Sequence, residues 1–183
     1  TTTPPPAVGT GLTVSKPTQP ENSLAPQGAA RVPFTKVTLT AGSDGAVTVN
    51  SLTVERVGLA QDSAFASIVL LDDQGLQVGL SKTFNSNHRA TVGEAVTIPA
   101  GQSRTFTVAG KMAASLANNA GEVPALSVVS VNTSAAVSGV LPIVGAAHTT
   151  NATISIGTVT AQRGPLDPNA AVTKNVGTTG YIF

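Results

Sequence analysis

Apolar and polar residues alternate along much of this chain with the two-residue period of a β-strand. The alternation is regular in Phe34–Ala41 and resumes after a Gly-Ser-Asp-Gly turn. Ala64–Gly79 is typical of a hairpin: an apolar strand, an Asp-Asp-Gln-Gly turn and a strand returning from Leu76 follow one another. A second turn, Ile98–Ser103, combines proline and glycine between two further alternating segments. The spacing predicts about seven to nine short strands, as in an all-β, Ig-like antiparallel β-sandwich.

The alternation changes phase inside the segment 46–58. Val47 and Val49 fall on one face of the predicted strand, whereas Leu52 and Val54 fall on the other. A bulge or a break near Asn50–Ser51 would account for this change of phase. We therefore expect an irregular strand at this position.

Two stretches interrupt the strand pattern. Lys16–Gly28 contains three prolines, which disfavour both a helix and a central strand, so this stretch is expected to cross between strands without belonging to a sheet. Lys111–Gly121 is the only plausible helical turn in the chain, and Gly121 would close it.

An internal repeat links the two ends of the chain. When Gly11–Gln27 is laid over the stretch that begins near Asn151, one offset pairs Leu12 with Ile154 and Val14 with Ile156. The same offset pairs three identical residues, Thr18 with Thr160, Leu24 with Leu166 and Pro26 with Pro168. Each copy is a short alternating strand followed by a proline-containing crossover.

A terminal strand of this kind carries backbone groups that need partners, so we expect it to pair with the edge of a sheet. Pairing within its own domain, with a following module of a longer polypeptide, or with the next subunit of a filament all remain open. The second copy ends in a segment in which Phe183 stands near the position of a new strand, as though a further module began there. The residues predicted to mediate assembly are Leu12, Val14, Ile154, Ile156, Tyr181 and Phe183.

These patterns divide the chain into four parts. Residues 1–10 form a Thr/Pro-rich linker, and residues 11–33 form a strand with its proline-rich connector. Residues 34–150 form the β-sandwich domain, and residues 151–183 form a C-terminal strand and connector that resemble the first.

The composition narrows the range of functions. Charged residues make up 10% of the 183 residues and the formal net charge is +1, so no electrostatic footprint for nucleic acid is visible. The absence of cysteine excludes disulfides and cysteine-ligated metal sites. A Thr- and Ser-rich, charge-poor sequence favours an extracellular, cell-surface location.

No targeting or spanning segment is recognisable. The first residues, TTTPPPAVGTG, lack the basic and apolar regions of a signal peptide, so a targeting segment would have been removed or would lie outside this sequence. The longest mainly apolar run, Ala135–Ala147, contains Pro142 and is too short to cross a bilayer of about 30 Å. We therefore predict no membrane span.

Few residues suggest a catalytic or metal-binding site. His88 and His148 are the only near-neutral acid–base groups, neither lies in a catalytic motif, and both are predicted to be surface residues, so we expect no enzyme activity. Asp72 and Asp73, joined by Asp62, offer oxygen ligands for calcium, although an Asp-Asp-Gln-Gly run is also ordinary turn chemistry. Apart from calcium at these residues, we expect no cofactor.

Two sequons, Asn132–Ser134 and Asn151–Thr153, make N-linked glycans possible. The Thr/Pro-rich head could carry O-linked glycans as well. Because the chain is rich in threonine, sequons of this kind also arise by chance.

Three elements recur in a recognisable order: a strand ending in ERVG, an AQDSAFASIVLLDDQG hairpin, and an IPAGQS turn before RTFTVAG. Together they resemble a β-sandwich module found in tandem in large bacterial and archaeal cell-surface and surface-layer-like proteins. The likeness covers about residues 34–131 and rests on strands and turns. It implies a structural or adhesive surface role and implies no catalytic residues.

The function expected from these observations is that of a structural module or subunit of an extracellular fibre, pilus or surface layer, assembled through its terminal strands. The alternative is an adhesive or carbohydrate-binding module. Sugar-binding sheets use exposed aromatic side chains, and this chain has no Trp, one Tyr and five Phe. The composition therefore favours the structural role, with neighbouring modules or copies of the chain as partners.

Overall fold

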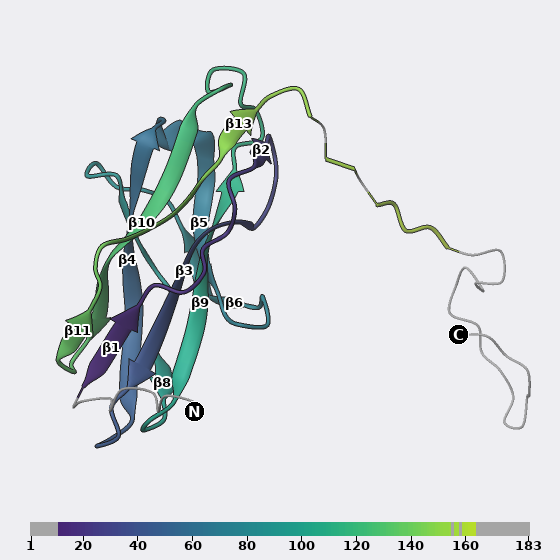
Figure 1. The fold of residues 1–183 in the computed structure, drawn as a ribbon. Coiled ribbons are helices and arrows are strands. Elements are labelled where there is room, and N and C mark those ends of the chain that lie inside the picture. The colour runs from purple at the N-terminus through teal and green to yellow at the C-terminus, as the bar shows by residue number, and fades with distance from the viewer. Residues whose placement is uncertain (1–10, 155, 158, 164–183) are drawn as a thin grey trace, which may run out of the picture.

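The computed structural model describes residues 11–154, 156–157 and 159–163. Their strands pack into a β-sandwich (Figure 1). The first strands are β1 (Leu12–Ser15), β2 (Leu24–Pro26), β3 (Val32–Ala41), β4 (Val47–Leu59), β5 (Phe65–Leu71), β6 (Gln77–Lys82) and β7 (Arg89–Val92). The later strands are β8 (Val96–Ile98), β9 (Ser103–Met112), β10 (Val123–Thr133), β11 (Val137–Gly139), β12 (Ile143–Ala147) and β13 (Thr149–Asn151). A single 3₁₀ turn, η1 (Asp62–Ala64), precedes β5 within the described ranges.

Among the described residues the strands form two main sheets and one small ribbon. One main sheet has the order β11-β1-β3-β9-β5-β6, and the other has the order β12-β10-β4-β7, with β8 also paired to β4. Strands β2 and β13 form the ribbon. Neighbours are antiparallel except for β1 with β11 and β2 with β13, which are parallel. The expected all-β, mainly antiparallel sandwich is confirmed.

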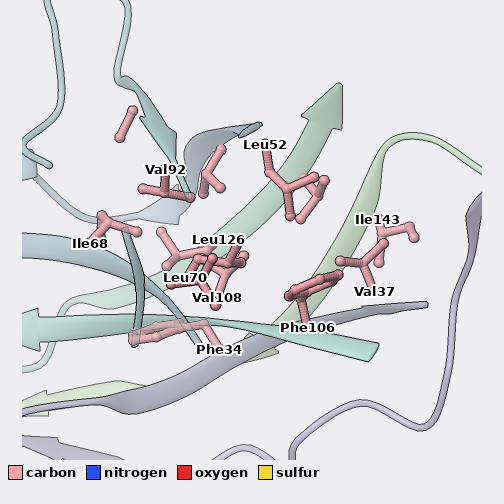
Figure 2. Close-up of a cluster of buried hydrophobic side chains, with 14 of the residues drawn as sticks. Phe34, Val37, Leu52, Ile68, Leu70, Val92, Phe106, Val108, Leu126 and Ile143 are labelled. Carbon is pink, nitrogen blue, oxygen red and sulfur yellow. The ribbon is translucent and has the colours of Figure 1, made fainter. Parts of the chain in front are cut away.

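The core lies between the two main sheets. Phe34 and Phe106 from one sheet are buried in the same cluster as Leu52 and Leu126 from the other (Figure 2). Burying a side chain of this size stabilises a fold by about 1.5–3 kcal/mol. The alternating apolar positions of the sequence supply this cluster from both sheets.

The predicted change of phase in β4 is a β-bulge. Along the pairing of β4 with β10, Ser51 lies opposite Asn132 and Val49 lies opposite Thr133, so Asn50 is an extra residue in its strand. Val49 and Leu52 are both buried, whereas Asn50 is exposed. The bulge therefore keeps both apolar sets of this long strand facing the core.

The predicted helical turn at Lys111–Gly121 is wrong. Strand β9 continues to Met112, and the residues after it form turns. Leu116 is fully buried, and the Asn119 side chain bonds to Ser63 and Glu122. These tertiary contacts outweigh the modest helical preference of an alanine-rich run.

The expectation that Lys16–Gly28 stays outside every sheet is also wrong. Leu24–Pro26 forms β2, which pairs with β13, and Pro26 lies opposite Asn151. Pro26 is tolerated because it ends a short strand of a two-stranded ribbon, where few amide donors are needed.

Candidate functional site

The first copy of the repeat is built into the sandwich. Leu12 and Val14 are 0% and 1% exposed, and their strand lies between β3 and β11. Thr13 pairs with Thr40 of β3 on one side and with Ser138 of β11 on the other. The sequence left open whether such a strand pairs within its own domain, with a following module or with another subunit. β1 pairs within its own domain.

The crossover after β1 is held against β3 by a side chain that acts as a strand edge. The Gln19 carboxamide oxygen accepts from the Lys36 backbone N–H at 2.9 Å, and its nitrogen donates to the Lys36 carbonyl at 2.8 Å. The same nitrogen donates to the Pro17 carbonyl, which orients the amide. Gln19 therefore satisfies backbone groups of Lys36 at a place where β1 has already ended.

His148 anchors the rest of the connector. It is 1% exposed, so its predicted surface position is wrong. Its Nδ1 accepts from the Ser23 backbone N–H at 3.1 Å, and its Nε2 donates to the Pro33 carbonyl at 2.9 Å. The ring also meets Phe34 edge to face at 4.5 Å between centroids. One residue thereby ties the segment before β13 to both the connector and β3.

Asn151 turns the chain out of the sandwich. Its backbone carbonyl accepts from Gln27, while its side-chain oxygen accepts from the backbone N–H groups of Thr153 and Ile154 at 2.9 and 2.7 Å. This Asx turn ends β13 and starts the second copy of the repeat. Beyond it the chain leads away from the sheets (Figure 1).

The second copy lies in a different environment from the first. Ile154 and Ile156 are 41% and 47% exposed, and neither belongs to a strand of the described ranges. The structure therefore separates the predicted assembly residues into a buried pair, Leu12 and Val14, and an exposed pair. Tyr181 and Phe183 lie outside the described residues.

The chain enters the sandwich at Gly11 and leaves it after Asn151, and these two places lie at opposite ends of the sandwich. The Gly11 carbonyl accepts from Gly42, which follows the last residue of β3. Asn151 instead bonds to Gln27, which comes before β3 begins. Because β3 has 10 residues and a strand rises by about 3.3 Å per residue, the two places are at least roughly 30 Å apart.

Asp72 has a structural role in the β5–β6 turn. Its Oδ1 accepts from the backbone N–H groups of Gln74 and Leu76 at 3.0 and 2.8 Å. Asp73 lies 3.6 Å from the Arg104 guanidinium. These contacts are those of the turn chemistry that the sequence offered as the alternative to calcium.

Asp62 lies in a small charged cluster at the other end of β5. The Arg56 Nε donates to one carboxylate oxygen, and His88 Nδ1 lies 2.8 Å from the other. Partial burial opposes ionisation of Asp62, but the bonds to His88 and Arg56 outweigh it and hold the pKa of Asp62 below its usual value. The 54% exposed side chain of His88 agrees with its predicted surface position.

The three predicted calcium ligands are not brought together. The length of β5 separates Asp62 from Asp72 and Asp73. Across the part of the chain that the structure describes, no three His, Asp or Glu side chains are grouped so as to hold a metal ion. One calcium ion could therefore not be bound by Asp62 together with Asp72 or Asp73.

The two sequons lie in contrasting places. The Asn132 side-chain nitrogen donates to the hydroxyls of Ser51 and Thr53, so a glycan there would have to displace two bonds within the sheet. Asn151 stands at the exit turn and uses its oxygen, not its nitrogen, in the bonds described above.

The sequence did not predict which residues hold the connector and the exit turn. These residues are Gln19, His148 and Asn151. Only Asn151 carried a local signal, because Asn before a Thr-rich segment favours an Asx turn. The contacts of Gln19 and His148 depend on long-range folding and leave no mark in the alternation.

Neither protein-family models nor curated protein sequences give a match to this chain. The resemblance to tandem cell-surface modules therefore stays a prediction, whereas the β-sandwich that it implied is present in the structure. Within the described ranges there is also no helix with the length and hydrophobicity needed to cross a membrane.

Proposed function

We propose that this chain is a structural module of an extracellular fibre, pilus or surface layer, joined end to end to its neighbours through its terminal segments. The observation that carries the proposal is the contrast between the two copies of the repeat. Leu12 and Val14 complete a sheet, whereas Ile154 and Ile156 have the same spacing and are exposed to solvent. Apolar strand residues left in water favour association with another sheet.

The placement of the two copies supports a linear arrangement. The chain joins the sandwich beside Gly42 and leaves it beside Gln27, at opposite ends of β3. A module with its connections at opposite ends forms an extended array when the contact is repeated head to tail. If both connections lay at the same end, two modules would instead form a closed pair that cannot be extended.

The proposal is tested by following self-association of the purified chain with concentration. We expect sedimentation velocity to show species that grow with concentration, and electron microscopy to show linear arrays. The double variant I154S/I156S should shift the association to at least about tenfold higher concentration, because it removes the two exposed apolar side chains.

A matched control changes an exposed apolar residue elsewhere. Leu80 is 74% exposed on β6, at the edge of the β1 sheet that lies far from β1. L80S should therefore leave self-association unchanged. A wild-type chain that stays monomeric at the highest concentrations reached would contradict the proposed function. Equal effects of L80S and I154S/I156S would show that the association is not carried by the terminal segment.

A further inference from the structure

We propose that the segment carrying Ile154 and Ile156 is a second β1 strand, which occupies the slot between β3 and β11 of another copy of this chain in place of that copy's Leu12–Ser15. The inference rests on the proposed function and identifies the contact that joins the modules. The slot is defined here as the space between β3 and β11 that β1 fills.

The slot selects for the residue pattern that both copies share. It buries the side chains at positions 12 and 14 completely, while Thr13 is half-buried and Ser15 is exposed. Ile154 and Ile156 have the same separation of two. Isoleucine has the volume of leucine, so Ile154 matches the space of Leu12, and its β-branch suits a strand. Ile156 has one methylene more than Val14, which the packing around that position has to accommodate.

At the entrance to the slot, a Cβ on Gly11 would lie 2.4 Å from the Ala136 carbonyl oxygen, and Thr153 corresponds to Gly11, so the equivalent strand begins at Ile154. A second close contact is made by the receiving domain. On β11, a Cβ built on Gly139 would lie 2.0 Å from the Val14 carbonyl oxygen, so the backbone of the strand in the slot passes directly over this glycine. This contact involves the backbone of the inserted strand and not its side chains. A strand from another copy can therefore make it equally well.

The direction of the chain fits the exchange. β1 begins beside Ala136 and Gly42 and runs towards the end of the sandwich from which the chain leaves after Asn151. When copies stack end to end, the segment leaving one copy reaches the beginning of the slot in the next and runs in the direction of β1. A hollow of about 310 Å³, lined in part by Gly11, Asp44 and Ala135, lies beside the beginning of the slot and gives an incoming chain room.

The short spacing sets the geometry of the array. Ile154 follows Asn151 by three residues, which span at most about 10 Å. Neighbouring sandwiches must therefore almost touch, and the axial repeat should be on the order of 40 Å, the length of β3 plus this link.

The equivalence is confined to the strand. Ala161 stands at the position that corresponds to Gln19, so the second copy lacks the side chain that clamps the crossover to Lys36. β1 makes four residue pairs with β3 and three with β11. When another strand takes its place, it can make the same number of backbone pairs with both neighbours. Exchange of equivalent strands between copies costs little in backbone pairing, because the strand pairs that break and those that form are alike.

The test uses single cysteines in an otherwise cysteine-free chain. Ser15 lies opposite Thr38 in the slot, and Gly157 corresponds to Ser15 in the second copy. Thr38 is covered by β9 on its other side, so only a strand in the slot can lie beside it. Full-length G157C and T38C chains are mixed under mild oxidation, and the mixed disulfide dimer is measured by mass.

We expect the G157C–T38C dimer to form at least about tenfold more than a dimer of G157C with T97C, whose cysteine replaces an exposed threonine on β8 of the other sheet. Adding I154S/I156S to the G157C chain should abolish the excess. Adding V14A to the T38C chain should increase it, because V14A loosens the strand that competes for the slot.

The outcomes separate the inference from the proposed function. A mixed dimer no more abundant with T38C than with T97C, in a chain that does self-associate, would overturn the slot and leave the assembly standing. Abundant T38C dimers without extended arrays would support the slot and contradict the fibre. A chain that forms neither would overturn both.

Discussion

Leu12–Ser15 and the segment around Ile154 and Ile156 have the same alternation but opposite environments. The first pair of apolar residues is fully buried between two strands, and the second pair is exposed by 41% and 47%. Alternation therefore specifies that a segment is suited to a sheet, but it does not specify which sheet. The difference between the two regions lies in their anchors, since Gln19 and His148 hold the first connector in place.

The largest expected effect comes from removing the apolar pair from each region in turn. L12S/V14S should lower the free energy of unfolding by about 5 kcal/mol or more, because it leaves cavities and buries two hydroxyls in the core. I154S/I156S should change it by no more than about 0.5 kcal/mol in the monomer. Urea denaturation at low protein concentration measures both values.

Similar losses of unfolding free energy in L12S/V14S and I154S/I156S would contradict the contrast between the two regions. They would show that Ile154 and Ile156 are already packed within their own copy. A small loss in L12S/V14S would mean that β1 contributes little to the stability of its own domain.

The anchor at His148 should have the next largest effect. H148A should lower the free energy of unfolding by about 2–4 kcal/mol, because it opens a cavity beside Phe34 and leaves the Ser23 N–H and the Pro33 carbonyl without their partner. Hydrogen exchange should speed up at Gln27 and Thr149, whose amides bond across the β2–β13 ribbon and its flanks.

H88A is the matched control, because His88 is exposed and contacts only the Asp62 cluster among the side-chain bonds of the described residues. It should cost less than about 1 kcal/mol and leave exchange at Gln27 and Thr149 unchanged. Equal effects of H148A and H88A would show that the connector is held by its backbone bonds alone.

Local pattern was sufficient to predict most strands of the sandwich. The β5–β6 hairpin and the bulge at Asn50 follow from alternation and turn residues, both of which act over a few positions. The calcium hypothesis grouped Asp62 with Asp72, and β5 separates them, because an extended strand carries residues apart by about 3.3 Å each.

The features that local pattern missed depend on long-range contacts. Leu116 and Asn119 are held by partners far away in the sequence, so an apparently helical segment forms turns. His148 is buried because Ser23 and Pro33 surround it, although nothing in its neighbouring residues distinguishes it from a surface histidine. The repeat was visible in the sequence, but the contrasting environments of its two copies were not.

The smallest expected effect concerns pH, and it offers a reference that touches neither copy of the repeat. The bonds from His88 and Arg56 lower the pKa of Asp62 in the folded state. A lowered pKa means that this stabilisation is fully present above the pKa of the unfolded chain, about 3.9, and is lost as the pH falls through the lower folded value. Because Asp62 is 32% exposed, the contribution should stay below about 1 kcal/mol.

Comparing wild type with D62N by urea denaturation between pH 7 and pH 2.5 measures this contribution. The difference in stability between the two should shrink as the pH falls below about 4, since both then carry a neutral side chain at position 62. Self-association through Ile154 and Ile156 should be equal in the two proteins at neutral pH, because no bond of Asp62 reaches that segment in the described residues. A D62N chain that assembles poorly while its domain stays folded would show that the Asp62 cluster is coupled to the segment that leaves the sandwich at the same end, because Gln61 and Thr150 both bond to Glu122.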